Sequence, residues 1–406
     1  MNEIASHRSQ RRKELAIVFL LIMVSGNPAF SSSLASPVIL LPLTLYLLFF
    51  HHATDDSGFY KKLSILGLGF FAILVIHALQ FNVYAINASA FFLLKIFSGG
   101  LVIHKIGPRF PERLFSIVFF ISLVSLICYA VLLTVGPDAM PGYEDPELLG
   151  QNVKSMLIFT TLMTDEWWRN CSLLWEPGAF QAIINLSLAL LPISSWLAPQ
   201  RRLRMICVLL ALLTTFSTTG YLLFFLLAIL KFSQIRQSWL IRLPLIALAV
   251  VTSVVATFEL DFLGDKIAGQ YERSFDTLDF APDRFGSLLF DIHYIEKNPV
   301  FGNGLTEETR LADNPELHGL SLGHSNGLSN FVATFGFFGA LLYFFCLLTG
   351  QTGLTRGDRI VLAIAVGVIV FSEQFLGYAL FLGLPFLRLM DLRSTVTHRP
   401  LVAIPS

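Results

Sequence analysis

Long apolar runs recur along this sequence and leave few folds open to it. The chain of 406 residues is 54% hydrophobic and only 14% charged, whereas soluble domains are about 25% charged. The runs cover residues 15–24, 34–50, 63–81, 84–103, 114–135, 177–197, 203–232, 240–258, 326–348, 360–372 and 375–390. Several approach the length of about 17–25 residues with which a helix crosses a bilayer. The sequence therefore predicts an all-α fold, in which residues 1–406 form one integral membrane domain of about 12 spans.

The run over residues 203–232 is interpreted as two short spans rather than one long helix. Arg201, Arg202 and Arg204 lie at the start of the run, and Lys231 and Arg236 lie at its other end. Basic residues favour the cytoplasmic side of a membrane, and a single crossing cannot leave both ends on that side. The polar segment Ser217–Gly220 is therefore predicted to break the run near the opposite face.

The basic residues also predict the orientation of the chain. Arg8 and Arg11–Lys13 precede the first apolar run, which is interpreted as an uncleaved first span. If this end lies in the cytoplasm, every basic loop lies there too. The two long polar loops, residues 136–175 and 259–323, then lie on the side of the membrane that faces away from the cytoplasm.

Charge balance and cysteine spacing exclude other classes of protein. The chain has 28 basic and 28 acidic residues, which argues against the extended basic surface of a nucleic-acid-binding protein. Its four cysteines have no metal-site or disulfide spacing. Three lie in apolar runs, and Cys171 is expected to be an exposed thiol in a polar loop.

The first long loop ends in a candidate site. Arg169 is followed by Glu176 and Pro177, and proline fits the first turn of a helix because it lacks an amide hydrogen. Glu176 would then lie at the membrane end of a helix, where a carboxylate complements the helix dipole. A capping acid among interfacial tryptophans is the alternative interpretation.

The second long loop contains a helix start at Pro282-Asp283, with Arg284 in the first turn. The apolar residues that follow have the spacing of a helix lying on the membrane surface, and they are Phe285, Leu288, Leu289, Ile292 and Ile295. An arginine beside a helix N-terminus can bind phosphate oxygens. A surface arginine paired with Asp283 or Asp291 is the alternative.

Further polar candidates lie at the ends of apolar runs or inside them. His324 can act as a general base near neutral pH, with Asn326 to orient it, or it can be an interfacial histidine bonded to a backbone carbonyl. Lys95, His77 and Glu373 lie within apolar runs, where charged and polar residues are functional candidates. Glu373 is a candidate partner for an arginine of the site.

Four short motifs together resemble the bacterial O-antigen polymerase and ligase superfamily of membrane glycosyltransferases. In chain order they are Arg169 followed by residues 175–181, the break at residues 217–220, Arg284 followed by residues 298–304, and residues 324–326 followed by 335–339. The Glu-Pro-Gly segment is similar to that of the polymerases. The family often has an arginine in the break, whereas Thr218 or Thr219 stands there in this chain, so Arg169 or Arg273 is the candidate for the missing charge.

The resemblance implies a polymerase that extends a surface polysaccharide (O-antigen, capsule or exopolysaccharide) from undecaprenyl-diphosphate-linked repeat units, without a cofactor or metal. It implies the bacterial inner membrane, a periplasmic active site, and a chain-length regulator as a partner. Arg284 with Arg169 would bind the donor diphosphate, and His324 or Glu176 would accept the proton of the attacking hydroxyl. The alternatives are a ligase that transfers polymer to lipid A–core and a transporter of the same lipid.

Overall fold

The computed structural model describes residues 2–31, 35–50, 57–148, 151–234, 284–311, 326–349 and 356–388. This part of the chain is mostly helical. Three of its helical stretches are long and apolar enough to cross a membrane: Gly58–Phe81, Ile86–Val135 and Gly327–Thr349. These stretches are typical of a protein embedded in a membrane.

The elements follow the apolar runs closely. In chain order they are α1 (Asn2–Met23), α2 (Ala35–Phe50), α3 (Ser57–Phe81), α4 (Ile86–Ile106), η1 (Gly107–Arg109), α5 (Phe110–Val135), β1 (Tyr143–Leu148), β2 (Gln151–Ser155), β3 (Thr160–Leu162), α6 (Pro177–Leu190), α7 (Ile193–Trp196), η2 (Pro199–Arg201), α8 (Arg202–Leu213), α9 (Thr218–Ser233), α12 (Arg284–Lys297), α13 (Glu307–Arg310), α14 (Gly327–Thr349), α15 (Arg356–Ser372), η4 (Phe375–Gly377), α16 (Ala379–Leu382) and η5 (Leu384–Phe386). The predicted run 240–258 lies outside the described residues.

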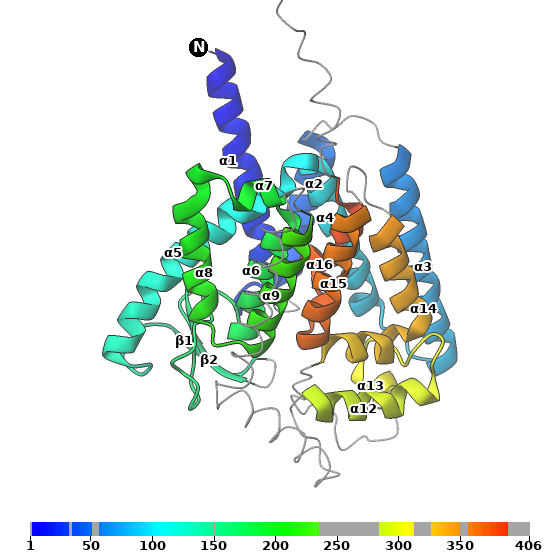
Figure 1. The fold of residues 1–406 in the computed structure, drawn as a ribbon. Helices are drawn as coiled ribbons and strands as arrows, with labels where there is room; N and C mark the ends of the chain where they lie inside the picture. Colours follow the sequence, from blue (N-terminus) through cyan, green and yellow to red (C-terminus); the bar gives the residue numbers. More distant parts are fainter. Residues whose placement is uncertain are drawn as a thin grey trace, which may run out of the picture.

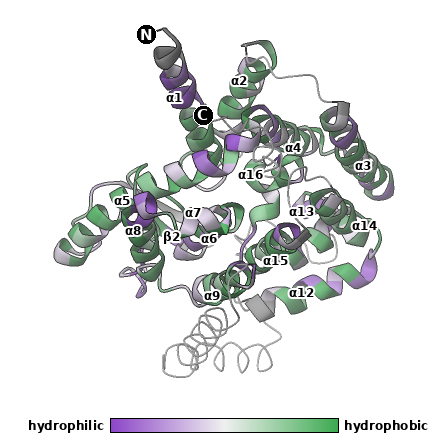
Figure 2. Ribbon diagram, turned by 45° about the horizontal axis from the view of Figure 1, so that its top comes forward, coloured by the Kyte–Doolittle hydropathy of each residue, from purple (hydrophilic) through white to green (hydrophobic). Residues whose placement is uncertain are grey.

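Helices α1, α3, α8 and α9 stand roughly upright and α5 runs obliquely, whereas α12 lies crosswise at the end opposite to the N-terminus of α1 (Figure 1). Figure 2 shows a hydrophilic N-terminal part of α1, mainly hydrophobic outer helices, and alternating polar and apolar residues along α12. Leu68, Leu79 and Leu341 are more than half exposed, at 66%, 72% and 69%. Such exposed apolar side chains are typical of helix faces that contact lipid.

The prediction that residues 203–232 form two helices is confirmed. α8 ends at Leu213 and α9 begins at Thr218, and α9 turns back toward the end of the bundle where α8 begins (Figure 1). Phe216 has a left-handed φ of 47° in the turn. The Ser217 hydroxyl accepts a hydrogen bond from the backbone N–H of Gly220 at 3.3 Å, so serine caps α9.

The prediction of a mostly helical fold is confirmed. The first long loop also contains a small sheet that was not predicted, because β1, β2 and β3 pair as three antiparallel strands. One expectation from the sequence is wrong. The run 375–390 was expected to be one span, but over residues 375–388 it consists of the short helices η4, α16 and η5. Gly377, Gly383 and Pro385 interrupt it, since glycine weakens a helix and proline removes a backbone donor.

The glycine at position 99 lets α4 approach this interrupted segment. A Cβ at Gly99 would lie 1.9 Å from the carbonyl oxygen of Ala379 and 3.2 Å from the backbone nitrogen of Gly383. Neither backbone atom can rotate away as a side chain could. The close contact between α4 and α16 therefore requires glycine.

We expect Gly99→Ala to lower the free energy of unfolding by about 1–3 kcal/mol, the usual cost of overpacking. Gly67→Ala is the matched control, because Gly67 is also helical but a Cβ there meets nothing within 4 Å. This control should be neutral or stabilise by up to about 1 kcal/mol through helix propensity. Thermal unfolding of the detergent-solubilised protein measures both, and equal effects would contradict the contact.

Candidate functional site

The predicted site residues fall into two groups. His324 and Arg273 lie outside the described residues, and Arg284 is described only as the first residue of α12. Arg169, Glu176 and Asn326 are placed with their side chains. Glu373, which the motifs did not include, lies against Gly178 near Glu176 and against Gly327 next to Asn326.

Arg169 holds the break between α8 and α9. Its guanidinium forms an ion pair with Glu166, and its Nε–H donates to the carbonyl oxygen of Thr215 at 3.2 Å. The adjacent Asn170 donates from Nδ2 to Thr214 Oγ1 at 2.9 Å. The contacts of Arg169 within the described residues are therefore structural, and its binding of substrate stays a prediction.

Cys171 lies between Arg169 and Glu176 in the sequence. Its side chain is fully buried, so the expectation of an exposed thiol is wrong. Burial raises the pKa of the thiol, the nearby charge of Arg169 opposes this, and the charge of Glu176 adds to it. The charges of both predicted site residues therefore act on one buried thiol.

Glu176 immediately precedes α6, and Pro177 is in the first turn, as predicted. The indole N–H of Trp175 donates to Glu176 Oε1 at 3.0 Å. The backbone of Trp175 is tied to the end of α1, since its N–H donates to the Gly26 carbonyl at 3.2 Å. Asn27, which follows Gly26, donates from Nδ2 to the Leu173 carbonyl at 2.8 Å. α1 therefore sets the position of the carboxylate.

A second carboxylate, that of Glu373, lies at the same helix start. A Cβ at Gly178 would be 1.9 Å from Glu373 Oε1, so the glycine of the Glu-Pro-Gly segment makes room for this acid. Tyr378 lies within electrostatic range of both Glu176 and Glu373, and its ring stacks on Trp175 with centroids 5.3 Å apart. Residues 176 and 373 are remote in sequence, which is why no motif connected them.

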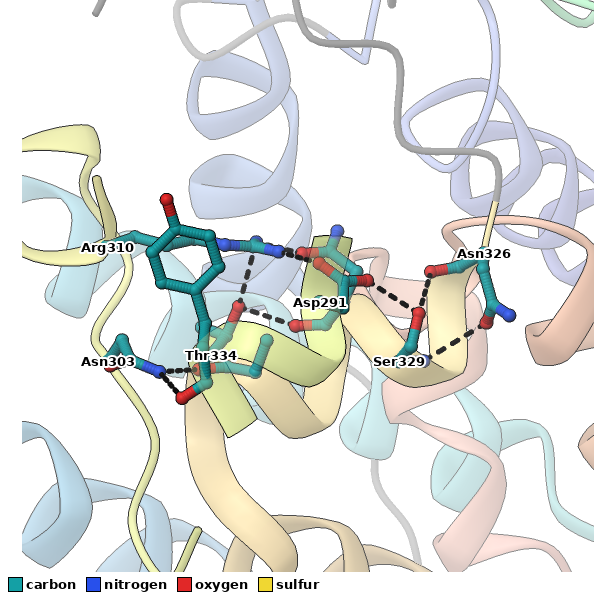
Figure 3. Close-up of polar contacts among 9 residues, drawn as sticks. Asp291, Asn303, Arg310, Asn326, Ser329 and Thr334 are labelled. Atoms are coloured by element: carbon teal, nitrogen blue, oxygen red, sulfur yellow. Dashed lines mark hydrogen bonds and ion pairs between the residues drawn. The ribbon is translucent and has the colours of Figure 1, made fainter. Parts of the chain in front are cut away.

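The second loop contributes a buried ion pair that sequence reasoning missed (Figure 3). Arg310 of α13 pairs with Asp291 of α12 at 2.5 Å, and Ser329 Oγ donates to the other carboxylate oxygen at 2.5 Å. Arg310 also donates to Asn330 and, at 3.5 Å, to Thr334 Oγ1 of α14. Burial raises the pKa of Asp291, against the opposing effect of the Arg310 charge.

The pattern of α12 contained a signal for this pair. Asp291 is three residues after Leu288 and four before Ile295, so helical spacing places it on the apolar face. A buried carboxylate requires a cation or several donors. Asp291 is fully buried and is bound by Arg310. The side chain of Arg284 lies outside the described residues, so its pairing with Asp283 or Asp291 stays a prediction.

Asn326 begins α14. Its side chain is fully buried, and its Oδ1 accepts a hydrogen bond from the Ser329 N–H at 3.1 Å, the contact of a helix N-cap. Its Nδ2 has no partner among the described residues. The amide therefore has donors left for His324 or a substrate, which keeps its predicted role open.

A cavity of about 420 Å³ lies between α4, α13, α14 and η4. Its lining residues are Ala88, Phe91, Phe92, Lys95, Leu305, Arg310, Gly327, Asn330, Phe331, Thr334, Phe335, Gln374, Leu376 and Gly377. Two of them are cationic, three others carry hydrogen-bonding side chains, and none of these described residues is acidic. Lys95 Nζ lies 5.5 Å from the Tyr378 ring centroid, so Tyr378 connects the cavity to Glu176 and Glu373.

The carboxylates, Tyr378 and the cationic cavity thus form one polar site within an apolar bundle. Lys95 of the cavity lies near the Tyr378 ring, and the charges of Glu176 and Glu373 act on the same tyrosine. No model of a known protein family matches this chain, and no curated protein matches it either.

Proposed function

We propose that this protein is a membrane glycosyltransferase that polymerises undecaprenyl-diphosphate-linked oligosaccharide repeat units into a surface polysaccharide. The observation that carries the proposal is the cavity beside the carboxylates of Glu176 and Glu373, whose described lining residues include two cations and no acid. A glycosyl donor with a diphosphate leaving group needs cations at the phosphates and a base at the acceptor hydroxyl. Both kinds of group are present here.

The proposed reaction is a single displacement. The acceptor hydroxyl oxygen attacks the anomeric carbon, and the bond from that carbon to the diphosphate oxygen breaks with inversion. The hydroxyl proton passes to Glu176, which is partly exposed, and the lipid diphosphate leaves as an anion stabilised by the cations. His324 remains the alternative base, and Arg284, Arg169 and Arg273 remain candidates for further phosphate contacts.

The sidedness supports a periplasmic site in a bacterial inner membrane. The basic N-terminal part of α1 lies at one end of the bundle, and α12 lies at the other (Figure 1). Basic residues favour the cytoplasm, so α12 and α13 would face the periplasm. The other apolar runs would supply further spans, except 375–390, which is broken into short helices.

Transfer by purified protein tests the proposal. The full chain in nanodiscs is incubated with a lipid-diphosphate-linked repeat unit, and products are separated on a polysaccharide gel. A ladder of increasing length is the expected result. A product only when lipid A–core is added would indicate the ligase instead. Faster exchange of the lipid between leaflets without any glycan product would identify a transporter and overturn the enzyme.

A further inference from the structure

The charge of Lys95 lies deep in an apolar helix. Lys95 is nine residues after the start of α4, about 14 Å along the axis. Its ammonium group contacts aromatic rings, 4.3 Å from the centroid of Phe91 and 5.5 Å from that of Tyr378. Within the described part of the chain, no carboxylate lies at ion-pair distance from it. A charge inside a membrane protein is costly unless it is paired, so Lys95 calls for an anion.

The other groups around the cavity also favour an anion. Arg310 reaches the cavity from α13, and Asp291 balances its charge. Lys95 adds a second positive charge, so these three side chains together carry a net charge of plus one. Arg310 Nε has no hydrogen-bond partner among the described residues. Asn330, Thr334 and Gln374 supply polar side chains. Gly327 lines the cavity at the first turn of α14, where backbone N–H groups and the helix dipole attract negative charge.

We propose that this cavity binds a phosphate or diphosphate group, with Lys95 and Arg310 as its two cations. The identification of this anion as the diphosphate of the glycosyl donor rests on the proposed function. Lys95 then supplies the charge for which the sequence suggested Arg169 or Arg273. The volume of about 420 Å³ is within the range of small-ligand sites.

An apolar groove beside the cavity favours a lipid as the source of the anion. The groove holds about 270 Å³, shares Leu305 with the cavity, and is lined mostly by apolar residues of α3 and α4, including Phe71, Leu74 and Leu93. A hydrocarbon chain attached to the anion would find apolar surface next to the cations. A free diphosphate would gain nothing from the groove.

Ligand binding to the full chain in nanodiscs tests the site. The probes are a polyprenyl diphosphate, inorganic diphosphate and the uncharged polyprenol. We expect Lys95→Gln to weaken binding of the polyprenyl diphosphate by at least about tenfold, because a charge-assisted contact is lost. Lys95→Arg, which keeps the charge, should restore most of the affinity. Lys105→Gln is the matched control, because Lys105 lies near the other end of the same helix, and it should bind like the wild type.

The outcomes separate the site from the enzyme. Tight binding of polyprenyl diphosphate that depends on Lys95, without glycan transfer, supports the site and overturns the proposed function. Equal affinity for inorganic diphosphate keeps the anion site but makes a free anion its ligand. Unchanged affinity in Lys95→Gln and in Arg310→Met overturns the site, even if glycan transfer is found. Thermal unfolding of each variant confirms that binding is compared between folded proteins.

Discussion

Replacing Glu176 by glutamine is expected to lower the rate of glycan transfer by about 100-fold or more, the usual contribution of a general base. Glutamine has the shape of glutamate and can still accept the hydrogen bond from the Trp175 indole, so the backbone at the start of α6 should be unchanged. What it cannot do is accept the proton of the attacking hydroxyl. The initial rate of polymer formation by purified protein measures the effect.

Glu144→Gln is the control for this prediction. Glu144 is an exposed acid of the same loop whose described ion pair is with Lys154 at 3.6 Å, and its loss should leave the rate unchanged. Binding of the lipid donor should be similar in Glu176→Gln and the wild type, because the cations are intact. A wild-type rate in Glu176→Gln would assign the proton transfer to another group, of which His324 is the first to examine.

Replacing Asp291 by alanine is expected to lower the free energy of unfolding by about 3–5 kcal/mol, the cost of leaving a buried charge without its partner. The Arg310 side chain is only 12% exposed and would lose its carboxylate. Ser329 would lose the acceptor of its hydroxyl at the same time. Because α12 contacts the described remainder of the bundle largely through α14, this pair helps to hold the surface helix in place. Denaturant titration in micelles gives the free energy.

A double variant distinguishes a broken ion pair from general damage. Asp291→Leu combined with Arg310→Met removes both charges, and it should recover much of the stability, since apolar replacements of buried pairs are often neutral. Breaking the pair of Lys154 with Glu144, whose side chain is 61% exposed, should cost less than about 1 kcal/mol. A change below that value in Asp291→Ala would show that Arg310 finds another partner or water.

Some parts of the site could be predicted because the physics that produces them is local. Pro177 starts α6 because proline suits the first helical turn. Ser217 breaks the 203–232 run because its hydroxyl replaces a backbone acceptor at the start of α9. The basic residues at both ends of this run required a return of the chain, and α9 does return.

Other parts needed contacts between segments that are distant in the chain. Glu373 belongs to the same site as Glu176 only because α15 ends against the first turn of α6, where Gly178 leaves space for the acid. The run 375–390 had the composition of a span, but packing of its backbone against Gly99 in α4 holds a broken form. The strands of the first loop show little of the hydrophobic alternation typical of β-strands, so the sequence did not predict their sheet.

The sequence by itself determined where apolar helices form, where the 203–232 run turns and which loops carry polar groups, because hydropathy, capping and charge act over a few residues. Only the tertiary structure decided which polar groups share a site. It placed Lys95 of α4 and Arg310 of α13 at one cavity, and Asp291 against Arg310. The physical reason is that a buried charge is stabilised by whichever partner packing brings within reach, and that partner has no fixed distance along the chain.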